Sequence, residues 1–244
     1  MNLKGKTALI TGGAVRVGRA MTLALAADGA NVVINYNRSA DTAAATADEA
    51  RALGVDALVV QANIGDPDAV VALVEATNDR FGGVDVLVNS ASPFIRARLH
   101  ETTLDQWRFV LGALLDGPFL LSQAFAPGMV ARGSGLIVNI LDRGAFAPFL
   151  HFLAHSVGKH GLLGLTRNLA VELAPTVRVN AIAPGPVLPL EDHTPEQIAR
   201  VAENTLLGRW GMPNDVVKAL RYLIDADYVT GEVLFVDGGE RISG

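Results

Sequence analysis

Short apolar runs alternate with longer stretches of mixed polarity along the whole chain. The runs are rich in Val, Ile and Leu, which is typical of strands buried on both faces. The longer stretches carry apolar residues at helical spacing, and several begin at proline or end at glycine. Strands are therefore predicted at 7–10, 31–35, 57–60, 84–88, 135–140, 177–182 and 233–236. Helices are predicted at 15–27, 41–53, 67–80, 104–131, 153–173 and 213–224, with an irregular stretch before the last of them.

This alternation of strand and helix predicts a single α/β domain over residues 1–244. Repeated βα units with continuously apolar strands indicate a doubly wound Rossmann fold, in which a seven-stranded parallel sheet has helices on both faces. The predicted helices 104–131 and 153–173 are apolar over more than one face. Such helices are either buried in the core or packed against a second subunit, and both interpretations remain open.

The amino-acid composition limits the kinds of molecule that the protein can be expected to bind. Half of the 244 residues are apolar and 18% are charged, which favours a compact fold over disorder. The net charge of -5 offers no basic surface to nucleic acid or to an anionic membrane. The chain has no cysteine, which excludes disulfides and thiolate chemistry and fits a reducing cytoplasm. The polar N-terminus predicts no signal peptide, and no uninterrupted apolar run reaches bilayer length. We expect a cytoplasmic protein that binds a small molecule.

A glycine-rich segment, residues 11–18, joins the first strand to the first helix. Gly12 and Gly18 let the backbone turn tightly and approach a pyrophosphate, which the N–H groups of the helix N-terminus would bind. An ordinary tight loop can share this composition. The position of the turn, after a strand and at the start of a helix, favours a dinucleotide site.

The end of the second predicted strand distinguishes the two nicotinamide cofactors. NAD-binding proteins usually place an acidic residue there for the ribose 2′-hydroxyl. Here Asn37, Arg38 and Ser39 follow the strand, and no acid is present. Arg38 can bind a 2′-phosphate and Ser39 can donate to it, while Arg16 adds positive charge nearby. A charge-assisted hydrogen bond contributes roughly 1.5–3 kcal/mol, so the segment predicts NADP(H).

Several motifs together resemble the classical short-chain dehydrogenase/reductase family over nearly the whole chain. They are the glycine turn, the sequence Asn-Ser-Ala-Ser at 89–92, Lys159, Pro184-Gly185, and the tail at 230–239. The resemblance implies a homotetramer (or dimer) paired through the two long apolar helices. The cofactor site that the turn, the strand end and the resemblance together predict comprises Gly12, Arg16, Val17, Gly18, Asn37, Arg38, Ser39, Asn63, Ile64, Asn89, Ser90, Ala91, Lys159, Pro184, Gly185 and Val187.

Within that family, the chain resembles the pteridine reductase branch. Arg16 replaces the usual second glycine of the turn, and Asn-Arg-Ser follows the second strand. The resemblance implies that Arg16, Ser92, Phe94 and Asp142 line the substrate site, with Phe94 stacking the substrate ring against the nicotinamide. A pterin-like substrate is thus one of the carbonyl or imine compounds to be considered.

The catalytic positions of the family are only partly matched. The family uses a tyrosine as proton donor, a lysine four residues later on the same helix face, a serine thirteen residues before the tyrosine, and an asparagine in the preceding helix. Here Lys159 matches the lysine, while His155, Asp142 and Leu114 stand at the tyrosine, serine and asparagine positions. Aspartate at the serine position has a precedent in pteridine reductases.

These substitutions leave three interpretations. In the first, His155 replaces tyrosine as general acid/base, oriented by Asp142, and the protein is an NADP(H)-dependent reductase. In the second, the protein binds NADP(H) but is a catalytically impaired relative. In the third, Asp142 and His155 perform different chemistry, such as dehydration or proton abstraction.

Two further features of the sequence concern a possible metal site and the substrate lid. His151 and His155 have a spacing that can bind zinc, but no third ligand is evident, so no metal is predicted. The stretch 187–204, where the family places its substrate lid, is short and contains Pro189, Glu191 and Asp192. A short lid predicts a small substrate or an open pocket.

Overall fold

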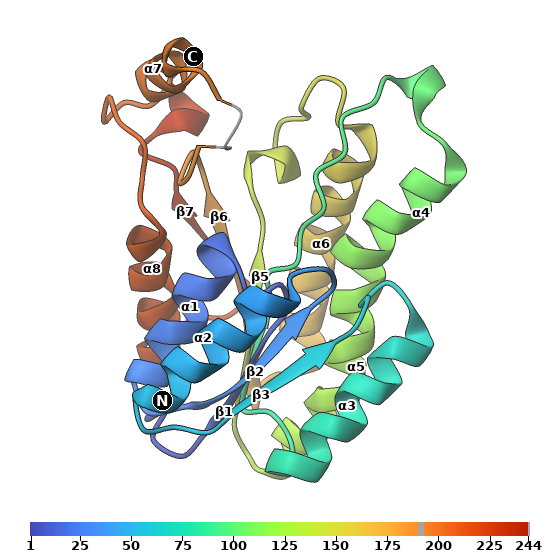
Figure 1. The fold of residues 1–244 in the computed structure, drawn as a ribbon, viewed down its shortest axis with the longest axis vertical. Helices are drawn as coiled ribbons and strands as arrows, with labels where there is room; N and C mark the ends of the chain where they lie inside the picture. Colours follow the sequence, from blue (N-terminus) through green and yellow to red (C-terminus); the bar gives the residue numbers. More distant parts are fainter. Residues whose placement is uncertain (190–192, 244) are drawn as a thin grey trace.

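The computed structural model describes residues 1–189 and 193–243. Its centre is one parallel sheet of seven strands in the order β3-β2-β1-β4-β5-β6-β7, which confirms the predicted fold class (Figure 1). The strands are β1 (Thr7–Ile10), β2 (Asn31–Tyr36), β3 (Ala57–Gln61), β4 (Val86–Asn89), β5 (Gly135–Ile140), β6 (Val177–Pro184) and β7 (Val233–Val236). The strand order reverses between β1 and β4, and in such sheets ligands bind beyond the carboxyl ends of the strands at that point.

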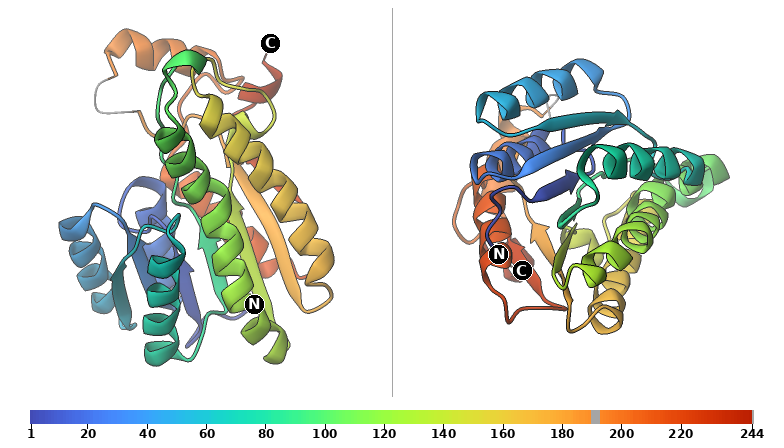
Figure 2. Two further views of the ribbon diagram at one scale, coloured as in Figure 1. Left: turned by 90° about the vertical axis from the view of Figure 1, so that its right-hand side faces the viewer. Right: turned by 90° about the horizontal axis from the view of Figure 1, so that it is seen from below.

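Helices cover both faces of the sheet (Figure 2). One face is covered by α1 (Arg16–Ala27), α2 (Ala40–Ala52) and α8 (Pro213–Asp225), which contact one another through α1. The other face is covered by α3 (Pro67–Phe81), α4 (Leu104–Leu111), α5 (Gly117–Ala131) and α6 (Leu153–Glu172). This two-sided covering explains why the strands read as continuous apolar runs.

Alternate residues of each strand enter different cores. Ile10, Ile34 and Val88 belong to the cluster beneath α1, α2 and α8, whereas Leu9 and Leu87 belong to the cluster beneath α3 and α5. β1, β4 and β5 are buried along their whole length. These rigid central strands hold the loops at their carboxyl ends in fixed positions.

The prediction of an irregular stretch before the last helix is wrong in one part, because that stretch contains the helix α7 (Pro195–Glu203). Thr194 and Gln197 form a capping box, in which each side chain accepts a hydrogen bond from the other's backbone N–H. Pro195 occupies the first helical turn, where its missing N–H costs nothing. The Thr-Pro-Glu-Gln sequence carried this signal, and the surrounding prolines and glycines obscured it.

The long helix predicted at 104–131 is continuous but not uniform. A π-helical segment, Gly112–Asp116, separates α4 from α5. The combined helix, Leu104–Ala131, is long and apolar enough to cross a membrane by length and composition alone, although Asp116 interrupts its apolar run. However, 56% of its most apolar stretch is buried inside the fold, as in a core helix. Packing in the core therefore accounts for about half of this stretch, and Phe119 and Val130 remain exposed on α5.

Candidate active site

The glycine turn lies where the sheet order reverses. Gly12 has a φ of +62°, and the turn is tied to β2 by a hydrogen bond from the Gly13 N–H to the Asn35 carbonyl at 3.1 Å. A Cβ at Gly12 would lie 3.1 Å from the Ala91 backbone, and one at Gly18 would collide with the Gly12 carbonyl. The turn therefore depends on glycine at both positions. In the described part of the chain, no side chain caps the first turn of α1, so its N–H groups remain available to an anion.

A cavity of about 660 Å³ opens beside this turn, between the ends of β1, β2, β3 and β4. Many of the predicted cofactor residues line it, namely Gly12, Asn37, Arg38, Ser39, Asn63, Ile64 and Ala91, together with the predicted substrate residues Ser92 and Phe94. The Arg38 guanidinium lies 5.6 Å from the centre of the Phe109 ring on α4, within range of a cation–π contact. Sequence reasoning missed Phe109, because a helical phenylalanine at this spacing is typical of the core.

Arg16 does not line this cavity. Its backbone adopts a left-handed φ of +51°, and its guanidinium donates to the carbonyls of Leu188 and Pro189 at 2.7 and 3.3 Å. The predicted positive charge beside the 2′-phosphate is thus directed toward the segment after β6. Gly18 is buried at the helix start, Val17 packs against the core beneath α1, and Val187 is buried in the same core.

The loop after β4 is fastened to the glycine turn. The backbone N–H groups of Ser90 and Ala91 both donate to Oγ1 of Thr11, at 2.9 and 3.0 Å. Nδ2 of Asn89 donates to Asn139 at 2.8 Å, and Asn139 in turn donates to Thr166. Asn139 therefore braces the end of the neighbouring strand.

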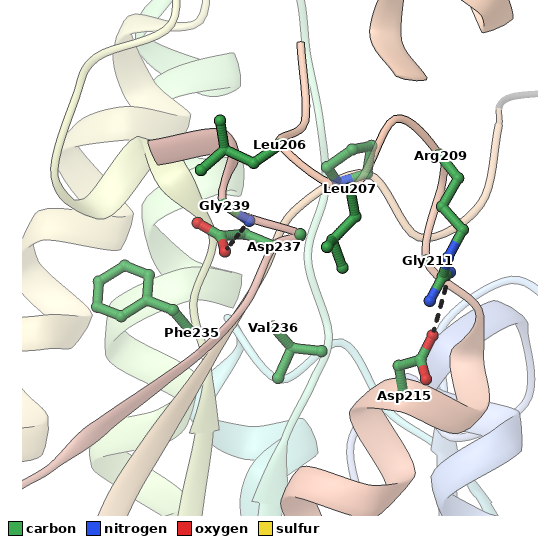
Figure 3. Close-up of a pocket in the computed structure, with 11 residues that line it drawn as sticks. Leu206, Leu207, Arg209, Gly211, Asp215, Phe235, Val236, Asp237 and Gly239 are labelled. Carbon is green, nitrogen blue, oxygen red and sulfur yellow. Dashed lines mark hydrogen bonds and ion pairs between the residues drawn. The ribbon is translucent and has the colours of Figure 1, made fainter. Parts of the chain in front are cut away.

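Pro184 and Gly185 follow at the end of β6. The Gly185 N–H donates to the Val236 carbonyl at 3.0 Å. A Cβ at Gly185 would lie 2.7 Å from the Asp237 backbone, so the approach of the β6 and β7 ends requires glycine. On the far side of this junction lies a second cavity, of about 520 Å³, bounded by Leu206, Arg209 and Asp237 (Figure 3). It shares none of its lining with the first cavity.

The three predicted catalytic residues come together at the ends of β5 and α6. Nε2 of His155 lies 2.7 Å from Oδ2 of Asp142, and Nζ of Lys159 donates to the Ile140 carbonyl at 2.7 Å. His155 and Lys159 occupy successive turns of one face of α6, and both are 2% exposed. The other ring nitrogen of His155, Nδ1, lies 3.3 Å from the Pro93 carbonyl. The predicted dyad of Asp142 and His155 is therefore present in the structure.

Burial and charge act in opposite directions on these groups. Burial raises the pKa of the Asp142 carboxyl, but the hydrogen bond with His155, the charge of Lys159 and the Gly144 N–H together outweigh it, so the pKa lies below the ordinary value. Burial lowers the pKa of the Lys159 ammonium, and the Asp142 carboxylate only partly opposes this. The site thus favours a charged Asp142 and weakens the proton affinity of Lys159.

Leu114, at the position of the family asparagine, is part of an apolar cluster. It lies in the π-helical segment and packs with Val110 and Ala154. A Cβ at Gly158 would lie 2.9 Å from the Leu114 side chain, so α6 approaches the segment closely here. An apolar residue therefore fills the place where the family has an amide.

Three phenylalanines pack together beside His155, the predicted proton donor, and we call Phe94, Phe149 and Phe152 the aromatic group. Phe94 stacks on Phe152 with 4.0 Å between ring centres and meets the His155 ring edge-on at 4.6 Å. Phe149 lies 6.2 Å from the same histidine. Phe94 was predicted, whereas Phe149 and Phe152 were missed because they lie in an irregular loop with no spacing signal.

The predicted lid is seen in part. Pro189 accepts from Arg16 as described, whereas Glu191 and Asp192 lie outside the described residues. Trp210 donates from its indole N–H to the Ile198 carbonyl at 2.8 Å, which fixes α7 against the turn before α8.

Among residues 1–189 and 193–243, no group of three His, Asp or Glu side chains could hold a metal ion.

Comparison with known proteins places this geometry in a family. The family described as enoyl-(acyl carrier protein) reductase matches residues 13–240. The chain is 37% identical over 242 residues to the 3-oxoacyl-[acyl-carrier-protein] reductase of Synechocystis sp., with 97% of each chain covered. Among solved structures, the FolM alternative dihydrofolate reductase 1 of Brucella canis, complexed with NADP, has a TM-score of 0.92 at 34% identity, covering 99% of this chain and 96% of that one. A blue fluorescent protein from a metagenomic library, in complex with NADPH, has a TM-score of 0.88 at 32% identity, covering 98% of this chain and 99% of that one. The chain therefore belongs to the classical short-chain dehydrogenase/reductase family.

Proposed function

We propose that this protein is an NADPH-dependent reductase of carbonyl or imine groups on small molecules. The cofactor assignment is supported by the glycine turn, by Arg38 and Ser39 at the end of β2, and by similar structures that contain NADP or NADPH. Gly12 lets the loop after β4 approach the turn closely at Ala91, and the uncapped N–H groups at the start of α1 can bind a pyrophosphate beside it. Arg38 and Ser39 would hold the 2′-phosphate.

The observation that carries the catalytic assignment is the 2.7 Å contact between His155 and Asp142. When bound, NADPH supplies the hydride. His155 holds the proton that goes to the substrate oxygen or nitrogen, since imidazole can donate and accept protons near neutral pH. Asp142 orients the ring through its contact with Nε2. Lys159, one helical turn away and buried, fixes the end of β5 through the Ile140 carbonyl.

A second candidate function is NADP(H) binding with little turnover. The arrangement of His155 favours it, because Nε2 faces Asp142 and Nδ1 faces the Pro93 carbonyl, so each ring nitrogen has a protein acceptor. Leu114 also supplies no polar group to a proton relay. In the reductase, the ring must break the longer contact, that with Pro93, when substrate binds.

Mixing the protein and NADPH with dicarbonyls, quinones and oxidised pterins distinguishes the two functions. Loss of NADPH absorbance that requires substrate supports the reductase. Tight NADPH binding, measured by fluorescence titration, without turnover of any of these compounds overturns it and leaves the binding protein. Including the pterins tests the finer assignment.

A pterin-like ring is the finer substrate candidate. The half-exposed Phe94 ring lies at the edge of the cofactor cavity, beside Ser92 and close to His155. A flat heterocycle could stack on it once Phe94 separates from Phe152. The similarity to a dihydrofolate reductase supports this substrate class.

We also propose that the protein is a cytoplasmic homotetramer or dimer. Phe119 and Val130 on α5 and Val157 and Val171 on α6 form exposed apolar positions on helices that run side by side (Figure 2). Pairing with a second copy would cover them. Sedimentation that gives a monomer at micromolar concentration would contradict this assembly.

A further inference from the structure

An ion pair links the catalytic loop to the C-terminal segment. Arg143 directly follows Asp142 and begins the 3-10 helix Arg143–Ala145. Its Nη1 lies 3.5 Å from Oε1 of Glu240, which begins the short helix Glu240–Ile242 after β7. The carboxylate thus comes from a part of the sequence almost one hundred residues away from the arginine.

The Arg143 guanidinium has N–H donors that lack a hydrogen-bond acceptor among the described residues. Within the described residues, its ionic contact is the one with Glu240, and 3.5 Å is long for a charge-assisted hydrogen bond. Its Nε is buried and has no hydrogen-bond partner in that part of the chain. Arginine binds carboxylates best through two parallel N–H donors, so this side chain retains the capacity for a second acceptor.

The guanidinium is also close to the reaction centre. It lies over the Phe149 ring, 5.0 Å from the ring centre. Phe149 belongs to the aromatic group and lies 6.2 Å, centre to centre, from the His155 ring. The guanidinium and the His155 ring thus both lie within 6.2 Å of the centre of the Phe149 ring, so a substrate group bound to Arg143 would lie near the proton donor.

Glu240 is a replaceable partner for this arginine. Its side chain is largely buried, and burial raises the pKa of its carboxyl. Arg143 lowers that pKa, but the negative charges of Asp237 and Asp142 raise it further, so the balance is upward. A carboxylate that is crowded by two like charges is held less firmly than one that is paired alone.

We propose that Arg143 is a specificity residue that binds the carboxylate of an oxo acid substrate, with Glu240 occupying that place when no substrate is bound. The proposal rests on the proposed carbonyl reduction at His155. Among open-chain carbonyl compounds, it predicts a preference for short oxo acids over their uncharged esters. Binding requires Glu240 to turn away from the guanidinium, which the like charges of the neighbouring Asp237 and Asp142 favour.

Matched substrates test the proposal. NADPH oxidation is measured with a 3-oxo acid and its methyl ester for the wild type, Arg143→Leu, Arg143→Lys and Glu240→Gln. The wild type is expected to have the lower KM for the acid. Arg143→Leu should raise that KM about 10- to 100-fold and leave the KM of the ester within about twofold, since only the charge-assisted bonds are lost. Arg143→Lys should be intermediate, and Glu240→Gln should lower the KM for the acid.

Arg241→Leu is the matched control. It removes a positive charge from the same segment, at a side chain that lies over Phe235 and beside Asp237. Its kinetics for acid and ester should match the wild type. Equal preference for acid and ester in the wild type, or an equal effect of Arg143→Leu on both, overturns the assignment.

A binding measurement separates this proposal from the proposed reaction. Calorimetry of the NADP⁺-loaded protein with a saturated carboxylate of the same length needs no turnover. Binding that Arg143→Leu abolishes supports the carboxylate site even if no carbonyl is reduced. Reduction of neutral carbonyls without carboxylate binding supports the reaction and refutes the site.

Discussion

The candidate active site has two halves, which differ in how closely their residues match those typical of the family. The cofactor half, formed by the ends of β1, β2 and β3, retains its glycine turn and gathers Gly12, Arg38 and Asn63 around one cavity. The proposed catalytic half, formed by the ends of β5 and α6 and by the π-helical segment Gly112–Asp116, retains Lys159 but has His155, Asp142 and Leu114 at the other positions. Binding and chemistry can therefore vary separately on one fold, because different strand ends carry them.

The substitutions in the catalytic half also fit one another. Asp142 and His155 form a polar pair, while Leu114 completes an apolar cluster against Gly158. These three residues therefore pack and pair with their neighbours in a way that differs from the usual residues of the family, and each depends on the residue next to it. The following experiments test whether the two halves are as independent as this comparison implies.

The largest effect is expected from His155→Ala. For a substrate that the wild type reduces, kcat should fall by about 10²- to 10⁴-fold, the usual contribution of positioned proton transfer. The Kd of NADPH, measured by fluorescence titration, should stay within about twofold, because His155 lies outside the cavity that Arg38 lines. Unchanged kcat would assign the proton transfer to another group. Weaker NADPH binding would show that the halves are coupled.

Leu114→Asn tests whether the family asparagine can be restored alone. The amide would enter the apolar cluster with Val110 and Ala154, so the free energy of unfolding should fall by about 2–5 kcal/mol. Urea unfolding followed by Trp107 and Trp210 fluorescence measures this loss. Leu114→Met is the matched control and should cost less than about 1.5 kcal/mol. A gain in kcat without loss of stability would contradict the view that Leu114 belongs to an adapted set.

Arg38→Leu tests the cofactor half. The Kd of NADPH should rise about 10- to 150-fold, while that of NADH should change little, because only NADPH has the 2′-phosphate. Phe109→Leu should produce a smaller rise, since it keeps the charge and removes the ring beneath it. Equal losses for NADPH and NADH would show that Arg38 acts on the shape of the cavity rather than on the phosphate.

The sequence predicted the parts of the molecule that depend on local patterns. The strands, the glycine turn and the Asn37–Arg38–Ser39 segment are contiguous, so periodicity and residue type were enough. The Asp142–His155 contact was expected from the family spacing, and the structure contains it. By contrast, the aromatic group and the Arg143–Glu240 pair join residues from separate loops. Tertiary packing determines those contacts, and no spacing in the sequence records them. The contacts of Arg16 were not predicted for the same reason, because its partners, Leu188 and Pro189, are distant in sequence.

The smallest effect is expected from the acid titration of Asp142, which is still one-quarter exposed. Its pKa in the folded protein lies below the ordinary value of 3.8. Between these two pKa values the unfolded chain binds more protons than the folded protein, so the carboxylate stabilises the fold fully above the ordinary pKa, and this stabilisation is lost as the pH falls through the folded pKa. The difference in unfolding free energy between wild type and Asp142→Asn should therefore shrink from about pH 6 to about pH 3. Asp41→Asn, at an exposed position of α2, is the control for general effects of charge. If the wild type and Asp142→Asn keep a constant difference over this range, the Asp142 charge does not contribute to the pairing with His155, and the dyad is held by packing alone.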